Sequence, residues 1–311
     1  DQAVNTAALR LLNTGQLPMK GFGQLAMDAL TTPVAAMVDY NETLCHEWPH
    51  EIPARERSFH LKKGPLRGKI VEGFLDGLHS ADAPDSAKVP DVPDASKSPS
   101  AHAGENPADK NPRSTISPFS MDSLARWEFY SHDILDAKGT PLRLTPFTGL
   151  WVKHVIACAV GMSLTSCLGA PDGIVTLSPL GKNAARELLH DIIDLWWQGL
   201  CVPLPITPRT AMAWLLKAPG PEVKNTQAGA NALDGEDKGD EVSRAAMAMA
   251  INEASKVYQG DGFRPGEIGY TPCALRAYPD FDSLWQAHDN AFPLLARRLY
   301  GPLFNALKGA S

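Results

Sequence analysis

The chain of 311 residues lacks most of the features that assign a protein to a specialised class. It has only five widely spaced cysteines, Cys45, Cys158, Cys167, Cys201 and Cys273. An odd count without paired spacing is typical of free thiols in a reducing cytosol, not of a disulfide framework. No window approaches the roughly 18 apolar residues of a membrane span, and no secretory signal is visible. We therefore expect a cytoplasmic protein with no membrane contact.

An excess of basic residues is also missing. Lysine and arginine number 29 against 35 aspartates and glutamates, which gives a net charge of −6. A freestanding DNA-binding domain is usually much more basic. Residues 80–120 carry a net charge of −2 and residues 218–241 carry −4, so the rest of the chain is neutral. Composition therefore neither supports nor excludes nucleic acid as a ligand.

Motifs for nucleotides, acyl transfer and metals are absent as well. There is no G-x-x-x-x-G-K-[ST], no dinucleotide fingerprint and no G-x-S-x-G. The cluster Cys45-His46…His50 has no second group to complete a zinc site, and Pro49 breaks the helical spacing. We expect no metal site and no cofactor in this chain.

Two segments stand apart in composition. Residues 80–120 hold seven prolines, eight serines and seven alanines, with very few large apolar residues. Such a segment cannot bury enough surface to offset its ordering entropy, which predicts a disordered insertion. Residues 218–241 are predicted to be a shorter flexible loop. We expect residues 1–79 to hold N-terminal helices and a first core strand, and 121–311 to complete the same domain.

The remaining pattern is α/β. Apolar spacing predicts helices over 4–12, 24–43, 150–162, 182–198, 210–217 and 243–258. Branched and aromatic residues predict strands over 67–76, 126–131, 140–146 and 173–179. This order suggests a small mixed sheet flanked by helices and a helix-rich C-terminal part. It is the pattern of a restriction-endonuclease-like, PD-(D/E)XK-like core.

A nuclease of that fold needs carboxylates on neighbouring strands to hold a divalent metal, and a lysine to orient water. Glu72 and Asp76 lie at the end of the first predicted strand, in a G-x-x-D pattern. The next strand has Glu128 but Tyr130 where the lysine should stand, and the only literal D-x-K is Asp136-Ala-Lys138. Metal-dependent cleavage by Glu72, Asp76, Asp136 and Lys138 is therefore an alternative hypothesis, and a solvated loop is the simpler interpretation.

One basic cluster and one aromatic pair point to partners. Lys62, Lys63, Arg67 and Lys69 could contact phosphates, although a short charge run is usually just a solvated face. Trp196 and Trp197 are adjacent on a predicted helix, so one of them must point away from the core. We expect that side chain to meet a partner protein.

Several motifs in order resemble one family. The segments are GQLPMKGFG (15–23), LRL (142–144) with LWVKHV (150–155), VPLPITP (202–208), AWL (213–215), KVYQG (256–260), Gly266-Glu267 and AYP (277–279). Together they resemble the RecC C-terminal domain, over nearly the whole chain except 80–120. RecC is the gamma subunit of exodeoxyribonuclease V, the RecBCD helicase–nuclease. The insertion departs from the family pattern, and so does the surviving G-x-x-D at Asp76.

The resemblance implies a degenerate PD-(D/E)XK-like fold that has lost its metal ligands. It implies no active site in this chain, but a subunit of the ATP-dependent holoenzyme, in which Mg and ATP serve the partner subunits. The implied work is to help split duplex ends and guide single strands toward RecB-like and RecD-like subunits, in DNA repair and recombination. The start at Asp1 fits a fragment of a longer chain. An active nuclease and a protein-binding module without DNA contact remain the alternatives.

Overall fold

The computed structural model describes residues 2–16, 21–82, 123–137, 139, 141, 144–219 and 236–309. Most of the predicted insertion (80–120) and of the predicted loop (218–241) lies outside these ranges, as does Lys138. At their described ends the two segments differ from expectation. Ser80 belongs to a strand, and a helix already begins at Glu236.

A five-stranded mixed sheet forms the centre of the molecule, with strand order β1-β4-β5-β6-β7. Its strands are β1 (His50–Ile52), β4 (Leu78–Ser80), β5 (Leu124–Phe129), β6 (Leu164–Ala170) and β7 (Gly173–Leu177). β5 and β6 pair in parallel, and the other pairs are antiparallel. The predicted mixed α/β class is confirmed, whereas membership of the restriction-endonuclease-like fold stays a prediction.

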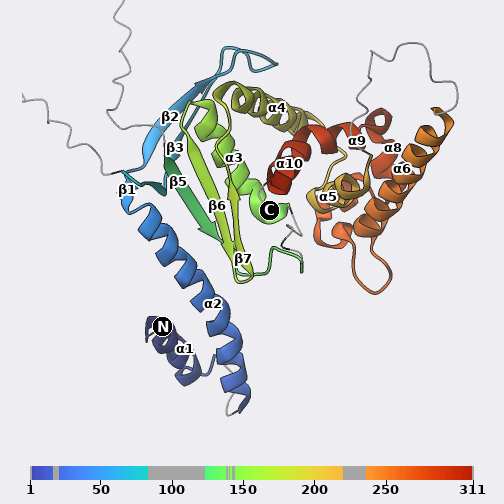
Figure 1. Ribbon diagram of the computed structural model, residues 1–311. Helices are drawn as coiled ribbons and strands as arrows, with labels where there is room; N and C mark the ends of the chain where they lie inside the picture. Colours follow the sequence, from blue (N-terminus) through green and yellow to red (C-terminus); the bar gives the residue numbers. More distant parts are fainter. Residues whose placement is uncertain are drawn as a thin grey trace, which may run out of the picture.

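The parallel pair requires a crossover, which helix α3 (Thr145–Ala159) supplies. α3 is apolar on nearly every side because it packs against both β6 and α4 (Lys182–Cys201). Its buried residues are Phe147, Leu150, Trp151, His154, Val155, Ala157, Cys158 and Ala159. Figure 1 shows α3 running along the sheet. α3 therefore links the central sheet to α4.

The strand predicted over 67–76 forms, but outside the central sheet. β3 (Ile70–Leu75) pairs only with β2 (Arg55–His60), as a separate two-stranded hairpin. Phe59 and Leu61 at the tip are buried, while Ile70 and Phe74 face solvent. The hairpin arches over the end of the sheet toward α4 (Figure 1).

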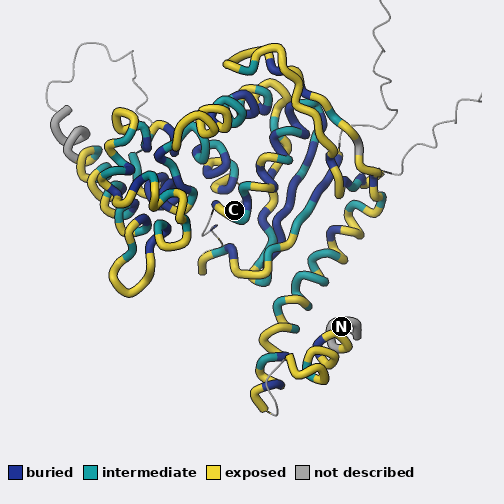
Figure 2. The backbone as a smooth tube through the Cα atoms, turned by 180° about the vertical axis from the view of Figure 1, so that it is seen from behind, coloured by how far each residue is buried: buried dark blue, intermediate teal, exposed yellow. Residues whose placement is uncertain are grey.

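Two N-terminal helices project from the sheet. They are α1 (Gln2–Asn13) and α2 (Gly21–Glu47), which pack against each other. α2 continues through Pro33. In Figure 2 this arm is largely exposed, in contrast to the buried strands of the sheet. The N-terminal arm therefore contributes little to the main core.

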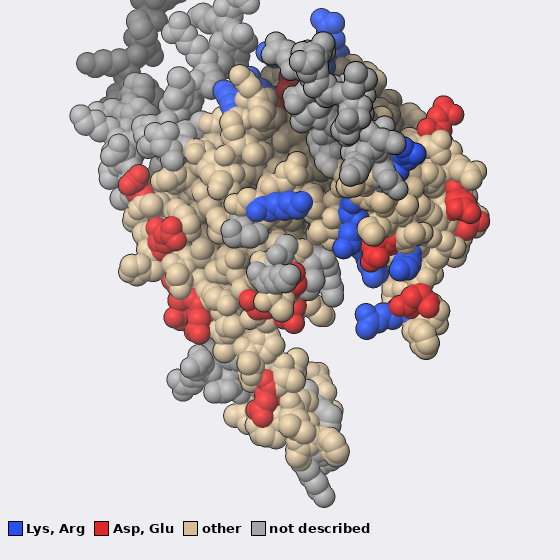
Figure 3. Space-filling model, turned by 45° about the vertical axis from the view of Figure 1, so that its right-hand side comes forward, with Lys and Arg blue, Asp and Glu red and all other residues tan. Residues whose placement is uncertain are grey.

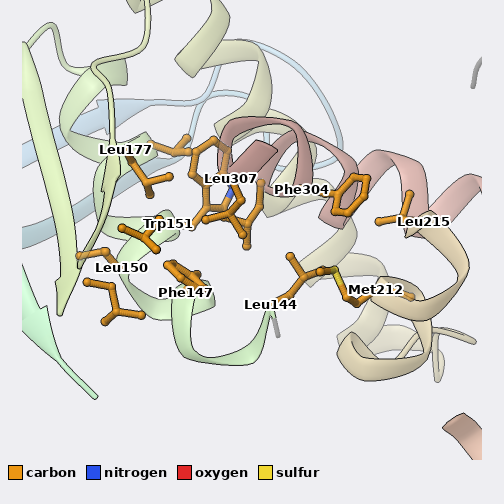
Figure 4. Close-up of a cluster of buried hydrophobic side chains, with 14 of the residues drawn as sticks. Leu144, Phe147, Leu150, Trp151, Leu177, Met212, Leu215, Phe304 and Leu307 are labelled. Carbon is orange, nitrogen blue, oxygen red and sulfur yellow. The ribbon is translucent and has the colours of Figure 1, made fainter. Parts of the chain in front are cut away.

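Helices make up the C-terminal part. They are α5 (Pro208–Lys217), α6 (Glu236–Gln259), η1 (Glu267–Tyr270), α7 (Pro272–Ala277), α8 (Phe281–Asn290), α9 (Phe292–Leu295), η2 (Ala296–Tyr300) and α10 (Gly301–Gly309). Figure 4 shows side chains of α3 and β7 in one cluster with those of α5 and α10. Phe147 and Leu177 thus share a continuous core with Met212 and Leu307. The C-terminal helices and the sheet are packed together.

The strand predicted over 140–146 is wrong in its second half. α3 already begins at Thr145, and Pro141 forms only an isolated bridge with Leu135. Pro146 suits the first turn of a helix, where its missing N–H costs nothing. The structure instead places a strand over Leu164–Ala170, which contains Ser166, Cys167 and Gly169.

Nothing in the described ranges has both the length and the hydrophobicity of a membrane-spanning helix.

Candidate functional site

A cluster of charged side chains gathers where the hairpin meets the sheet. Asp76 lies in the short turn between β3 and β4, and Arg126 and Glu128 lie on β5. The Arg126 guanidinium donates through Nε to the main-chain oxygen of Asp76 at 3.0 Å, and Nη2 lies 3.3 Å from Asp76 Oδ1. Its Nη1 donates to Glu128 Oε1. Arg126 therefore stands between Asp76, a carboxylate of the nuclease hypothesis, and Glu128 on its own strand.

The electrostatics of the cluster follow from this placement. Hydrogen bonding to Arg126 holds the pKa of Asp76 below its ordinary value. Partial burial of Glu128 opposes ionisation, but hydrogen bonds from Arg126 and Lys153 outweigh it and lower its pKa. Lys153, on α3, donates to Glu128 Oε1 at 2.9 Å. Both carboxylates are therefore ionised at neutral pH and neutralised by cations of the chain itself.

The other residues of the nuclease hypothesis are more dispersed. Glu72 is exposed on β3 and lines a pocket together with Lys153. Asp136 lies in the loop after β5. The two residues before it, Ile134 and Leu135, donate their main-chain N–H groups to the carboxylate of Asp172 in the β6–β7 turn. Lys138 lies outside the described residues. No three His, Cys, Asp or Glu side chains within the described ranges are arranged to hold a metal ion.

Arg126 and Lys153 were missed by sequence reasoning. A signal was present for Arg126, which follows the apolar Leu124 and Ala125 in a strand that reads as buried. In the structure Arg126 is 6% exposed. Since a buried arginine needs acidic partners, it should have pointed to Asp76 and Glu128. Lys153 had no comparable signal, because lysines on helix surfaces are common.

The predicted DNA-binding residues all lie in one loop at the tip of the hairpin. Lys62, Lys63, Arg67 and Lys69 are exposed in the connection between β2 and β3. The loop is closed by main-chain bonds, from Gly68 N to Leu61 O at 2.8 Å and from Leu61 N to Lys69 O at 3.0 Å. The structure thus brings all four basic residues together on one small, ordered projection.

The basic loop is docked on α4. Lys63 Nζ donates to both carboxylate oxygens of Glu187, at 2.7 and 2.8 Å. Gly64 has φ +74°, and a Cβ there would lie 2.1 Å from Asp194 Oδ1. Only glycine fits this approach without strain. Lys63 is therefore partly neutralised by α4, and Lys62, Arg67 and Lys69 are the more available cations.

An apolar patch lies at the C-terminal end of α4. Trp196 is 58% exposed and Trp197 37% exposed, so both tryptophans of the pair face outward. Leu200, 62% exposed, and Val202 extend this surface. The sequence predicted that one tryptophan would point away from the core, and the structure exposes both. We call these four residues the α4 patch.

The C-terminal motif residues form a structural network. Tyr258 Oη donates to the main-chain oxygen of Tyr278 at 2.7 Å, and Tyr278 Oη donates to that of Pro203 at 2.6 Å. Burial raises the pKa of Tyr258 to about 12, which keeps it a donor. The side chain of Glu267, the first residue of η1, is buried against the N-terminus of α5. There Arg209 N and Thr210 N donate to its carboxylate at 3.0 and 2.8 Å. These hydrogen bonds connect the C-terminal helices with one another and with the segment that follows α4.

A family model described as the RecC C-terminal domain matches residues 1–95 and 128–219, more than half of the chain. The chain belongs to the RecC C-terminal domain family. The match confirms the resemblance seen in the motifs. It covers the hairpin, the basic loop, α3, α4, α5 and the last two residues of β5. A search of curated proteins gave no match.

RecC membership implies a role in the RecBCD complex and its DNA repair, alongside RecB and RecD. The basic loop lies in the matched part of the chain, as do Asp76 and Glu128, whereas Arg126 lies between the two matched ranges. On the face shown in Figure 3, basic and acidic side chains are interspersed over a mostly uncharged surface. That face is therefore neither a uniform basic platform for DNA nor a purely acidic surface.

Proposed function

We propose that this RecC-type domain is a non-catalytic element that handles DNA and serves as a scaffold in a RecBCD-type helicase–nuclease. The observation that carries the proposal is the position of Arg126. Its guanidinium engages Asp76 and Glu128, so a side chain supplies the positive charge that a divalent ion would otherwise bring. A metal would have to displace a largely buried cation from two carboxylates.

Cleavage assays test the non-catalytic part. The purified chain is incubated with linear duplex and with single-stranded DNA, in magnesium or manganese. We expect no cleavage of either substrate. Cleavage that disappears in Asp76→Ala would overturn the proposal and establish the active nuclease, with Glu72, Asp136 and Lys138 as the next residues to change.

The DNA-handling part depends on the basic loop. Each phosphate contact that a lysine makes adds close to ~0.9 to the slope of log affinity against log salt. In an assembly with RecB-like and RecD-like subunits, reversing Lys62 and Lys63 to glutamate should reduce this slope. The matched control reverses Lys217 and Arg276, two exposed cations of the C-terminal helices. An equal slope in wild type and the loop variant would remove the loop from the DNA path.

The scaffold part is supported by the α4 patch, because exposed tryptophans are enriched where proteins meet. We expect a RecB-like or RecD-like subunit to cover it. Trp196→Ala with Leu200→Ala should weaken assembly, whereas Phe263→Ala, at a 97% exposed residue of another loop, should not. If the patch variant assembles normally but the loop variant loses DNA, the domain handles DNA without using this surface. If assembly fails and DNA binding is untouched, the protein-interaction module is the better description.

A further inference from the structure

We propose that a pocket between the hairpin and α4 binds a phosphate group, and that its expected source is the backbone of a single DNA strand. The pocket has a volume of about 400 Å³ and lies beside the basic loop. Four nitrogen-bearing side chains line it: His60, Lys62, Arg186 and His190. The identity of the DNA strand rests on the proposed DNA-handling function, but the phosphate site does not.

His190 places a buried, unpaired ring nitrogen in the wall of the pocket. The residue is only 7% exposed, and its Nδ1 has no hydrogen-bond partner among the described residues. The ring packs edge-on against Phe59, with centroids 5.4 Å apart. Leaving a buried polar atom unpaired costs on the order of 1–3 kcal/mol, so such atoms call for an explanation. An imidazole ring donates through a ring nitrogen, and a phosphate oxygen is a suitable acceptor for it.

The charges around the pocket favour an anion. The described residues that line it include no aspartate or glutamate. On the same helix, Glu187 is bound by Lys63 and Asp191 is bound by Arg298. Arg186 Nε donates to the main-chain oxygen of Ala159 at 3.0 Å, which anchors the guanidinium at the end of α3. An anchored arginine in the wall of a pocket is suited to bind phosphate oxygens.

The size of the pocket narrows the ligand class. A volume of about 400 Å³ exceeds what a bare phosphate needs and lies within the range of small-ligand sites. Phe59 and Val160 supply apolar wall beside the cationic groups. A phosphate with its attached sugar satisfies both parts of this lining. Lys62 belongs at once to the pocket and to the basic loop, so a strand that follows the loop would place a phosphate here.

Calorimetric titration of the full 311-residue chain at low salt tests the inference. One arm uses inorganic phosphate, and the other uses a single-stranded oligothymidylate. We expect both to bind, and phosphate to compete with the oligonucleotide. Lys62→Met and His190→Phe should each weaken phosphate binding by about tenfold or more, because each removes a charge-assisted donor. Lys217→Met, at an exposed lysine of α5 outside both the basic loop and the pocket lining, should leave phosphate binding unchanged.

The outcomes separate the site from the function. Wild-type chain that fails to bind phosphate, or phosphate binding that is equal in Lys62→Met and wild type, would overturn the site. Lys62 is exposed, so its substitution leaves folding intact even if His190→Phe does not. If both pocket variants still bind the oligonucleotide as the wild type does, the pocket is not where the strand binds. The DNA-handling role would then remain, but at another surface. Phosphate binding that depends on Lys62, without oligonucleotide binding, would retain the site and reject the strand as its source.

Discussion

Arg126 and Asp76 are joined both through the main chain and through the side chains. Nε of the guanidinium lies 3.0 Å from the main-chain oxygen of Asp76, and Nη2 lies 3.3 Å from its carboxylate. Asp76 ends the hairpin and Arg126 belongs to the central sheet, so this pair connects the two sheets. The same guanidinium also binds Glu128. One residue thus neutralises the cluster and holds the hairpin in place.

Replacing Arg126 by methionine should therefore destabilise the fold. The change leaves Glu128 partly buried with one cation fewer and frees the Asp76 oxygen, for a loss of about 2 kcal/mol in unfolding free energy. Urea denaturation monitored by circular dichroism measures it. Lys153→Met is the control, since that lysine is 44% exposed and its pair should be worth under about 1 kcal/mol. Equal losses in the two variants would contradict the central role of Arg126.

His154 should make stability depend on pH. It is fully buried on α3, with Nδ1 2.9 Å from Ser166 Oγ, and burial lowers its pKa to about 4. The unfolded chain, with an ordinary histidine pKa near ~6.5, binds more protons below that pH than the folded chain does. Folding should therefore lose stability as the pH falls from about 6.5 toward 4, by about 2–3 kcal/mol at pH 4.5 from this residue alone.

Denaturation at pH 7 and pH 4.5 checks this, with the double variant His154→Leu, Ser166→Ala as comparison. The double change removes the titrating group together with its side-chain partner Ser166, so the hydroxyl is not left unpaired. Its stability should fall less on acidification than that of the wild type, by about the stated amount. Identical acid dependence in both proteins would show that His154 does not resist protonation.

Glu267 should contribute more to the free energy of unfolding than an ordinary helix-capping residue does. Its buried carboxylate accepts from Arg209 N and Thr210 N, and from Thr210 Oγ1 at 2.8 Å, at the N-terminus of α5. Glu267→Ala strands these donors, and we expect a loss of about 3 kcal/mol in unfolding free energy. Asp280→Ala removes the exposed capping box of α8 and should cost about 1 kcal/mol. Thermal unfolding of both variants gives the comparison.

The regular elements with strong periodicity could be predicted from the sequence, and the long-range arrangement could not. α4 and α5 follow from apolar residues at helical spacing, and β5 follows from its aromatic and branched residues. β6 was missed because its Ser166, Cys167 and Gly169 have weak strand preferences. These small residues fit because the strand is covered on both sides, and a Cβ on Gly169 would lie 2.6 Å from Phe129. Such fitting depends on neighbours that are distant in sequence.

In the candidate site, too, local patterns could be predicted from the sequence and long-range contacts could not. Asp76 and the four basic loop residues could be found as short patterns, since each stands within a few residues of the others. The pairing of Asp76 with Arg126 spans 50 residues, and the pocket joins Lys62 to His190. No local spacing encodes either contact. What the sequence did contain was an arginine in an apolar strand, and that signal can be used wherever a strand is expected to be buried.

The docking of the basic loop can be tested with two glycines that share a backbone conformation. Gly64 and Gly68 have φ +74° and +85°, so an alanine at either position is strained by on the order of 1 kcal/mol. Only at Gly64 would the added Cβ meet Asp194, whereas a Cβ on Gly68 has open space. Gly64→Ala should therefore unfold at lower temperature than Gly68→Ala, by an amount equivalent to about 1 kcal/mol or more. It should also weaken the Lys63–Glu187 pair, because the loop must lift from α4. If Gly68→Ala proved as destabilising as Gly64→Ala, backbone strain alone would account for both, and the loop would not be held by contact with α4.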